Sequence, residues 1–388
     1  MTSAVLENVR DLLPEIRERA AECEAQRCVP EQSVKELAAA GVFRMLQPRR
    51  YDGLEGDPLD FYEAVRLIAS ADASTGWISS VLSVHAWQLA LFPAAAQEAV
   101  WGPDTGTLMS SSYAPTGSVT LTDGGYVVSG RWAFSSGCDH ADWVLLGGLV
   151  TDAEDRIVDF RTFLLPSSDY LIEDTWDTVG LAGTGSHDIV VERAFVPADF
   201  TLSMTETGRC AGPGQEINSG ELYRLPFHSL FTSAITTPII GMAYGAYDDH
   251  VATQRTRVRA AFTGERVVDD PFASVRIARA ASEVDAAWAL LRDNLRTEQA
   301  YVARGESIPQ ALRLRVRRDQ VTGTERAIEA IDLLFESAGA RALARGGYLQ
   351  QVWRDAHAGR VHAANDPERA LRMFGSSELG QPVGPGMY

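Results

Sequence analysis

Residues Arg131–His140, Arg-Trp-Ala-Phe-Ser-Ser-Gly-Cys-Asp-His, are the most informative stretch of this chain. They follow one strand-like run, 125–130, and precede another, 143–148. Two large aromatic residues, two serines and a histidine make a poor turn but suit a flat heteroaromatic ligand. Aromatic faces stack on such a ring, and hydroxyls reach the polar atoms at its edge. The alternative interpretation is a tryptophan that anchors a β-domain core.

Length and composition indicate a globular protein with more than one core. The 388 residues exceed one typical core, which predicts two or three packed units. An apolar content of 45% and a charged content of 22% are typical of a globular enzyme. The net charge of -17 argues against nucleic acid or an anionic membrane surface as a partner.

Cysteine spacing and hydropathy predict a cytoplasmic protein. The four cysteines form neither a CxxC pair nor a zinc-site spacing, so reduced thiols are expected, with no disulfide framework and no metal site. No apolar run approaches the roughly 18 residues of a membrane span. The first ten residues carry Glu7 and no long apolar stretch, so they do not predict a signal peptide.

The spacing of apolar residues changes twice along the chain. Apolar residues first recur every three or four positions, as in helices. They then alternate in seven short β-rich runs between residues 107 and 195, which predict a barrel or sandwich, and the helical spacing returns after the segment 204–222. Asp-Gly-Gly at 123–125 is typical of a hairpin turn. The polar segment 204–222 predicts a surface loop. Helices are expected at 5–40, 60–70, 74–92, 94–101, 233–262, 270–304, 309–338, 348–358 and 366–374.

These segments together predict an α+β fold with three parts. The first is an amino-terminal helical domain at 1–105. The second is a central β-barrel-like domain at 106–212. The third is a carboxyl-terminal domain at 213–388, in which three helices of about 30 residues form a long-helix bundle.

Six runs, spread in order over all three parts, carry a family resemblance. They are 110–115 (SSSYAP), 132–140 (WAFSSGCDH), 176–186 (WDTVGLAGTGS), 257–262 (RVRAAF), 353–357 (WRDAH) and 362–367 (HAANDP). Together they resemble the acyl-CoA dehydrogenase fold, and within it the flavin-dependent aromatic monooxygenases that use reduced flavin from a separate reductase. The likeness is greatest to oxygenase components that hydroxylate the phenolic ring of a seco-steroid in bacterial cholesterol breakdown.

The resemblance implies an enzyme that hydroxylates a phenolic substrate, with a seco-steroid phenol favoured. The cofactor would be reduced flavin, FADH2 or FMNH2, which reacts with O2 to give a C4a-hydroperoxyflavin. The expected partners are a flavin reductase, a small aromatic substrate and further copies of the chain in a homotetramer built through the bundle. Hydroxylation of an indole or another natural-product intermediate by the same chemistry stays open, as does the choice between FMN and FAD.

Residues 362–365 distinguish this chain from the dehydrogenase branch of the same fold. In many acyl-CoA dehydrogenases an aromatic-Glu-Gly-Thr run provides the catalytic base, whereas His-Ala-Ala-Asn stands here. Loss of a general base typically costs a factor of about 10²–10⁴ in rate. The segment 240–250 offers Asp248 and Asp249 but no glutamate. Acyl-CoA dehydrogenation is therefore the second alternative, and a flavin-fold scaffold without redox chemistry is the third.

The resemblance also implies three catalytic residues. Ser136 is placed near flavin N5, where its hydroxyl can accept from N5–H. His362 is placed beside the peroxide or the substrate hydroxyl, and His85 on the substrate side. A free imidazole titrates near 6.5 and a phenol near 10, so neutral histidine takes a phenol proton only with help from the site. A turn serine and a structural histidine are the alternative interpretations of Ser136 and His362.

The remaining implied residues would bind the cofactor. Trp132 and Phe134 would wall the flavin ring, and Trp77 would approach it from the helical domain unless it is a buried anchor. Arg257 would reach the flavin phosphate, often across a subunit boundary, because a guanidinium binds phosphate bidentately. The alternative for Arg257 is a solvated charge. Further cofactor contacts are expected from Ser111, Ser112, Ser135, Ser136, Ala340, Arg341, His362 and Asn365.

Overall fold

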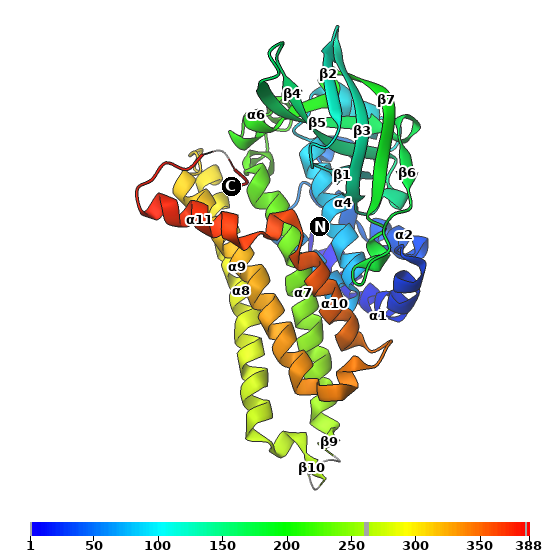
Figure 1. The fold of residues 1–388 in the computed structure, drawn as a ribbon, viewed down its shortest axis with the longest axis vertical. Coiled ribbons are helices and arrows are strands. Elements are labelled where there is room, and N and C mark those ends of the chain that lie inside the picture. The colour runs from blue at the N-terminus through cyan, green and yellow to red at the C-terminus, as the bar shows by residue number, and fades with distance from the viewer. Residues whose placement is uncertain (1, 260–263, 385) are drawn as a thin grey trace.

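The computed structural model describes residues 2–259, 264–384 and 386–388, and it confirms the α+β architecture (Figure 1). An amino-terminal group of helices supports a β sandwich, and a bundle of long helices extends away from both. The amino-terminal helices are α1 (Thr2–Gln26), α2 (Glu31–Ala40), α3 (Pro58–Ala71), α4 (Ala73–Leu89) and α5 (Ala94–Trp101).

Helix α4 is the central element of the amino-terminal part. Asp72 ends α3 and caps α4, because its carboxylate accepts from the backbone N–H of Thr75 at 2.7 Å. Every residue of α4 is buried, and the helix packs against α3 and α7. Side chains of α4 therefore reach both the β part and the bundle.

The central part consists of two four-stranded sheets that pack as a sandwich. Neighbouring strands are antiparallel except for β1 and β4, and the two sheets share an apolar core that includes Trp132, Val144, Phe163 and Ile189. One sheet has the order β1 (Met109–Ser112), β4 (Trp143–Thr151), β5 (Ile157–Pro166), β8 (Thr201–Ser203). The other has the order β2 (Ser118–Thr122), β3 (Gly125–Ser135), β7 (His187–Pro197), β6 (Leu171–Glu173).

Long helices form the carboxyl-terminal part. Helices α7, α8 and α9 pack along one another, and α10 lies against α7 and α9 (Figure 1). The short strands β9 and β10 lie at the end of the bundle remote from the sandwich. The bounds are α7 (Phe227–Thr256), β9 (Val258–Arg259), β10 (Glu265–Arg266), α8 (Pro271–Ala303), α9 (Gln310–Ala338), α10 (Tyr348–Arg360) and α11 (Pro367–Glu378).

Several predicted boundaries differ from the structure. Helix α7 begins directly after Pro226 and ends at Thr256; its predicted end at residue 262 lies outside the described residues. The predicted loop 204–222 contains the short helix α6 (Met204–Gly208). Strand β8 was not predicted, since three residues carry too little alternation. Strand β3 continues to Ser135, so half of the 131–140 segment lies on a strand instead of between strands.

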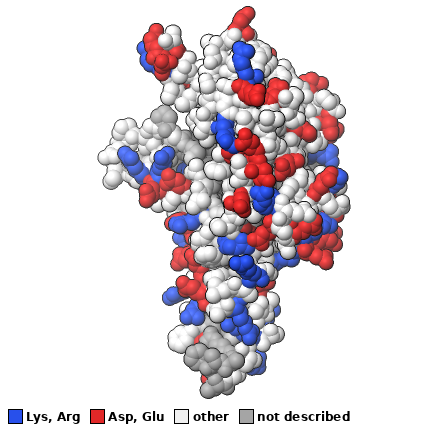
Figure 2. Space-filling model, turned by 45° about the vertical axis from the view of Figure 1, so that its right-hand side comes forward, with Lys and Arg blue, Asp and Glu red and all other residues white. Residues whose placement is uncertain are grey.

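Acidic and basic side chains lie intermingled over the face shown in Figure 2, on the sandwich as well as on the bundle. Among the described residues, the helices are all too short or too polar to cross a membrane.

Candidate flavin and substrate site

Side chains from all three parts of the chain meet around the hydroxyl of Ser136. Nε1 of Trp77, on α4, donates to Ser136 Oγ at 3.2 Å. Ser136 Oγ lies 2.7 Å from Ser186 Oγ, which in turn lies 2.7 Å from Thr184 Oγ1. The imidazole of His362 lies edge-on to Trp77, with 5.9 Å between ring centroids. The structure therefore brings together three predicted residues, Trp77, Ser136 and His362, which we call the Ser136 cluster.

An aromatic pair, of which Phe134 is exposed and Trp176 half-buried, adjoins this cluster. Phe134 is 67% exposed, although the side chain is large and apolar. Its φ of 68° is a left-handed conformation that costs a non-glycine residue about 1–3 kcal/mol and is found mainly at functional sites. The ring of Phe134 lies 5.6 Å from that of Trp176, whose Nε1 donates to the carbonyl of Leu181 at 2.8 Å.

This combination fits a flavin ring. Phe134 and Trp176 offer aromatic surface for stacking, and Ser136 offers a hydroxyl that can donate or accept at the ring edge. A strained backbone that exposes an aromatic side chain is explained by a flat ligand that covers it. Trp77 and Ser136 are thus in contact, with Phe134 two residues before Ser136, and their contact with a flavin stays a prediction.

His362 is held as a neutral hydrogen-bond donor. Burial, together with the charge of Arg317, lowers the pKa of the His362 imidazole to about 4. Its Nδ1 accepts from the backbone N–H of Ala364 at 3.1 Å, so the ring proton resides on Nε2. Arg317 donates to the Ala364 carbonyl at 2.6 Å and fixes the same turn. His362 is therefore suited to donate to an oxygen, and removal of a phenol proton is not favoured here.

His85 has the opposite arrangement. Its Nδ1 lies 2.8 Å from the Met109 carbonyl, which requires the proton on Nδ1 and leaves Nε2 as a bare acceptor. Nε2 is buried and has no partner among the described residues, and burial lowers the pKa of the ring to about 4. The half-buried Ser111 contacts Tyr113, which lies edge-on to His85 and to Phe231. His85 therefore offers an unpaired acceptor beside aromatic side chains, and its place on the substrate side stays a prediction.

Two predicted cofactor contacts have structural roles instead. Trp132 is fully buried in the sandwich core, and its Nε1 donates to the Gly147 carbonyl at 2.8 Å. The alternative interpretation, a tryptophan that anchors the β core, is therefore the correct one for this residue. The Ser112 hydroxyl donates to the Ala133 carbonyl at 2.7 Å and ties β1 to β3. Neither side chain reaches a ligand from this position.

Ser135 and Asn365 likewise face the protein interior. Ser135 is fully buried at the end of β3. The Asn365 amide accepts from Gln320 Nε2 at 2.8 Å and donates to the Gly359 carbonyl at 2.9 Å. Because its oxygen and nitrogen both have protein partners, Asn365 holds the turn that carries His362 and has no free polar atom for a cofactor.

The other predicted cofactor residues lie at the far end of the bundle. A cavity of about 170 Å³ is lined there by Arg257 and Arg341, among others, and we call it the bundle-end cavity. Arg257 lies within 3.5 Å of the Ser337 carbonyl, and Ala340 belongs to the adjoining turn Gly339–Leu343. Helix α7 has 30 residues and spans about 45 Å at 1.5 Å per residue, so this cavity is remote from the helix start beside Tyr113.

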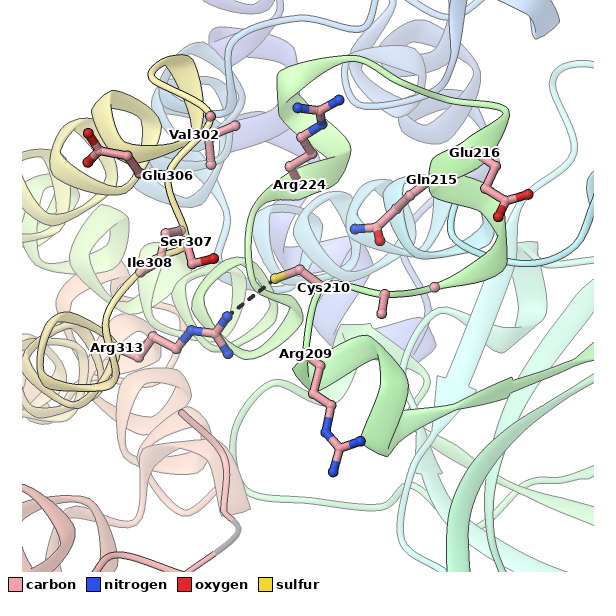
Figure 3. Close-up of a pocket in the computed structure, with 13 residues that line it drawn as sticks. Arg209, Cys210, Gln215, Glu216, Arg224, Val302, Glu306, Ser307, Ile308 and Arg313 are labelled. Carbon is pink, nitrogen blue, oxygen red and sulfur yellow. Dashed lines mark hydrogen bonds between the residues drawn. The ribbon is translucent and has the colours of Figure 1, made fainter.

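A second cavity, of about 510 Å³, lies between residues 209–216 and the turn that joins α8 to α9 (Figure 3). Arg209, Arg224 and Arg313 line it, and Arg313 donates to Cys210 Sγ at 3.4 Å. Its lining includes none of the predicted site residues. Cavity volume alone therefore does not identify the site in this chain.

The thiols are unsuited to nucleophilic chemistry. Cys28 Sγ lies 3.4 Å from Nε2 of His140. Burial raises the pKa of both Cys28 and Cys138 to about 12, so both thiols stay protonated and unreactive at neutral pH. In the part of the chain that the structure describes, no group of His, Cys, Asp or Glu side chains is placed to hold a metal ion.

Sequence reasoning missed three residues of this site. Trp176 and Ser186 both lie in a run that carries the resemblance, so a signal for them existed and was not used. Arg317 stands among other arginines at 313–318, and nothing in the sequence distinguishes it. Only burial singles it out, since long charged side chains are rarely enclosed without a specific task.

Comparisons with known proteins give the family. Residues 2–107 match the acyl-CoA dehydrogenase amino-terminal domain, and residues 233–367 match its carboxyl-terminal domain. The chain is 56% identical over 372 residues to the flavin-dependent monooxygenase oxygenase subunit HsaA of Rhodococcus jostii, covering 96% of this chain and 97% of that protein. For the HsaA subunit of Mycobacterium tuberculosis the identity is 52% over 384 residues, covering 99% and 97%.

A solved structure agrees with the sequence relatives. The crystal structure of 3-HSA hydroxylase from Rhodococcus sp. RHA1 matches with a TM-score of 0.96 at 54% identity, covering 99% of both chains. The match covers nearly the whole of both chains, so the two folds correspond over all three parts. The chain belongs to the acyl-CoA dehydrogenase family, in its branch of flavin-dependent monooxygenase oxygenase subunits.

Proposed function

We propose that this enzyme hydroxylates the ring of a phenol, with FADH2 delivered by a separate flavin reductase, and that a seco-steroid phenol is the preferred substrate. The Ser136 cluster beside the Phe134–Trp176 pair is the observation that carries the proposal. The names of further relatives support a phenol. They are a FADH2-dependent resorcinol hydroxylase oxygenase component from Rhizobium (36% identical) and a p-hydroxyphenylacetate 3-hydroxylase oxygenase component from Acinetobacter baumannii (31%).

When bound, reduced flavin supplies the electrons that activate O2 for transfer of one oxygen atom to the aromatic ring. Phe134 and Trp176 would offer aromatic surface to the flavin ring, and the Ser136 hydroxyl would accept a hydrogen bond from an N–H at the ring edge. Trp77 donates to the same hydroxyl and orients its lone pairs. Fixed partners in a water-poor site stabilise developing charge without reorganisation, which favours oxygen transfer over loss as hydrogen peroxide.

The two histidines offer complementary contacts. His362 donates through Nε2, whereas His85 accepts through Nε2. A phenol hydroxyl both donates and accepts, so it can use either contact. An indole N–H can only donate, and it would leave His362 without a substrate partner. This difference supports a phenol over an indole as the substrate.

The acyl-CoA alternative has less support. Relatives that span nearly the whole chain are oxygenase components, and alanines occupy positions 363 and 364 in the run that carries the base in dehydrogenases. Asp249 lines the bundle-end cavity, remote from the Ser136 cluster.

We further propose a cytoplasmic homotetramer. Near the start of α8, Phe272 and Val275 are exposed, and these apolar side chains would be covered by a second bundle. The cysteines are all free, as expected of a reducing compartment.

The test combines the purified enzyme with a generic flavin reductase, NADH, FAD and parallel panels of phenols and indoles. We expect a nearly colourless protein that converts phenols to dihydroxylated products and requires the reductase. A yellow protein with tightly bound FAD that oxidises acyl-CoA esters and hydroxylates none of the aromatics would overturn the proposal.

A further inference from the structure

The segment 176–186 carries Trp176 and Ser186 into the site, and it is organised around one peptide. Leu181 adopts a left-handed conformation with φ of 52°, which a leucine rarely does. Its carbonyl accepts from Trp176 Nε1 and from Thr184 Oγ1, both at 2.8 Å. One peptide thus holds the aromatic side of the site and the chain of hydroxyls that leads to Ser136.

Helix α10 anchors the same residue through its N–H, which belongs to the preceding peptide. The N–H of Leu181 donates to Oδ1 of Asp355 at 2.6 Å, and Asp355 is almost fully buried. The same helix approaches the segment so closely that a Cβ on Gly180 would lie 2.3 Å from the Arg354 carbonyl. Arg354 also donates to the Val179 carbonyl at 2.5 Å.

The same helix also determines the position of His362. Helix α10 ends at Arg360, and the turn with His362 follows at once. Asp355 therefore lies on α10, the helix that leads to His362. It also binds the N–H of Leu181, the residue whose carbonyl holds Trp176 and Thr184. A displacement of Leu181 would move Trp176 and the Thr184–Ser186 hydroxyls relative to His362.

We infer that Asp355 is a positioning residue for the flavin site: its carboxylate holds the Leu181 peptide, and thereby sets Trp176 and the Thr184–Ser186–Ser136 hydroxyl chain against His362. This inference deepens the proposed function and rests on it for the identity of the ring that the site holds.

The protonation of Asp355 should be visible in flavin binding. Burial raises the pKa of Asp355 to about 7; the Leu181 N–H opposes that shift, and the charge of Asp72 adds to it. The charge of Arg354 lowers the pKa of Asp355, and the charge of Glu24 raises it. The nearby Cys23 thiol stays neutral, because burial and the charge of Asp72 raise the pKa of that thiol well above its usual value. An ionised carboxylate accepts more strongly than a carboxylic acid. The anchor is therefore strongest above pH 7 and weakens as pH falls through 7.

The experiment measures the Kd of oxidised FAD by quenching of tryptophan fluorescence between pH 6 and 8.5. FAD is the probe because the phosphate monoester of FMN itself titrates near 6. We expect the wild-type Kd to fall as pH rises through 7 and the Kd of Asp355→Asn to be independent of pH, since an amide keeps the acceptor and does not titrate. Asp355→Ala, which loses a hydrogen bond to a charged group, should bind FAD about tenfold more weakly.

Glu325→Gln is the matched control, since Glu325 pairs with Arg360 on α10 at 2.7 Å without touching residues 176–186. It should retain the wild-type pH profile. A wild-type profile in Asp355→Asn, or unchanged FAD binding in folded Asp355→Ala, would overturn the inference. If FAD binding follows Asp355 but no aromatic compound is hydroxylated, the proposed function fails and the positioning role stands.

Discussion

At the junction of the three parts, Trp77 donates to Ser136 and lies edge-on to His362 within a single chain, whereas Arg257 and Arg341 line a cavity at the carboxyl-terminal end of α7. Gly359, three residues before His362, lies against both Trp77 and Ile239, and the part of α7 from Ile239 to its end at Thr256 rises about 25 Å at 1.5 Å per residue. One flavin ring cannot touch both. We propose that each chain assembles its own ring site and that Arg257 and Arg341 serve the flavin of a neighbouring copy, as the family resemblance implies for Arg257.

The two regions also differ in charge. Burial keeps His85 and His362 neutral at the junction, with the pKa of each lowered to about 4. The bundle end presents the guanidinium groups of Arg257 and Arg341. Neutral donors and acceptors in a water-poor site suit oxygen transfer, while guanidinium groups suit phosphate. Changes to the histidines at the junction should therefore affect product formation, and changes to the guanidinium groups at the bundle end should affect flavin affinity.

The largest effect is expected from His362→Ala. If Nε2–H of His362 donates to the reacting oxygen, hydroxylation should slow by about 10²-fold or more, with flavin Kd and melting temperature near wild type. With the pKa of His362 at about 4, the imidazole stays neutral between pH 6 and 8. The ratio of wild-type to variant rates should then be constant over that range in single-turnover measurements.

His357→Ala is the matched control for that variant. His357 lies on α10, and its Nδ1 lies 2.8 Å from the Trp353 carbonyl. These contacts with Trp353 do not involve the residues of the Ser136 cluster. It should hydroxylate at the wild-type rate. A large loss of melting temperature in His362→Ala with intact chemistry would show that His362 is structural.

A smaller effect is expected from Arg257→Ala. Loss of a charge-assisted hydrogen bond to phosphate should weaken flavin binding about 10- to 100-fold, while the product formed per flavin oxidised stays unchanged. Arg255 is exposed and lies two residues earlier; Arg255→Ala is the control and should bind flavin normally.

Light scattering at micromolar concentration should show a tetramer. A monomer with full activity would contradict the assignment of the bundle-end cavity to a neighbouring copy.

Periodicity and resemblance predicted the architecture and the Ser136 cluster, but not the orientation of each side chain. Residues 132 and 134 should share one face of a strand, since successive side chains alternate. The structure shows a register shift between Trp132 and Ser135, with Phe134 at φ of 68°. This bulge turns Phe134 outward while Trp132 stays in the core. Nothing in the sequence marks a bulge at a phenylalanine.

Long-range hydrogen bonds were equally hidden from the sequence. Asp355 and Leu181 are 174 residues apart, and the partners of Asn365 come from α9 and the end of α10. The short motif around each residue was recognisable by resemblance. Whether its polar atoms face a ligand or the protein depends on packing between helices, which local patterns do not encode.

The smallest effect, and the one that separates the two regions most finely, is expected from Ser136→Ala. The variant lacks one hydrogen bond to the flavin edge, worth about 0.5–1.5 kcal/mol, so the fraction of oxidised flavin that yields product should fall by up to about tenfold. Flavin oxidation should continue, with hydrogen peroxide rising as product falls.

Ser135→Ala is the control for Ser136→Ala. The buried Ser135 hydroxyl has no partner among the described residues, so its loss should leave the fraction of flavin oxidation that yields product unchanged. In Ser136→Ala, loss of this one hydrogen bond should weaken flavin binding by no more than about tenfold, less than the loss expected for Arg257→Ala. Unchanged coupling in Ser136→Ala would remove this hydroxyl from the flavin edge and leave Trp77 and Ser186 as its only partners in the described structure.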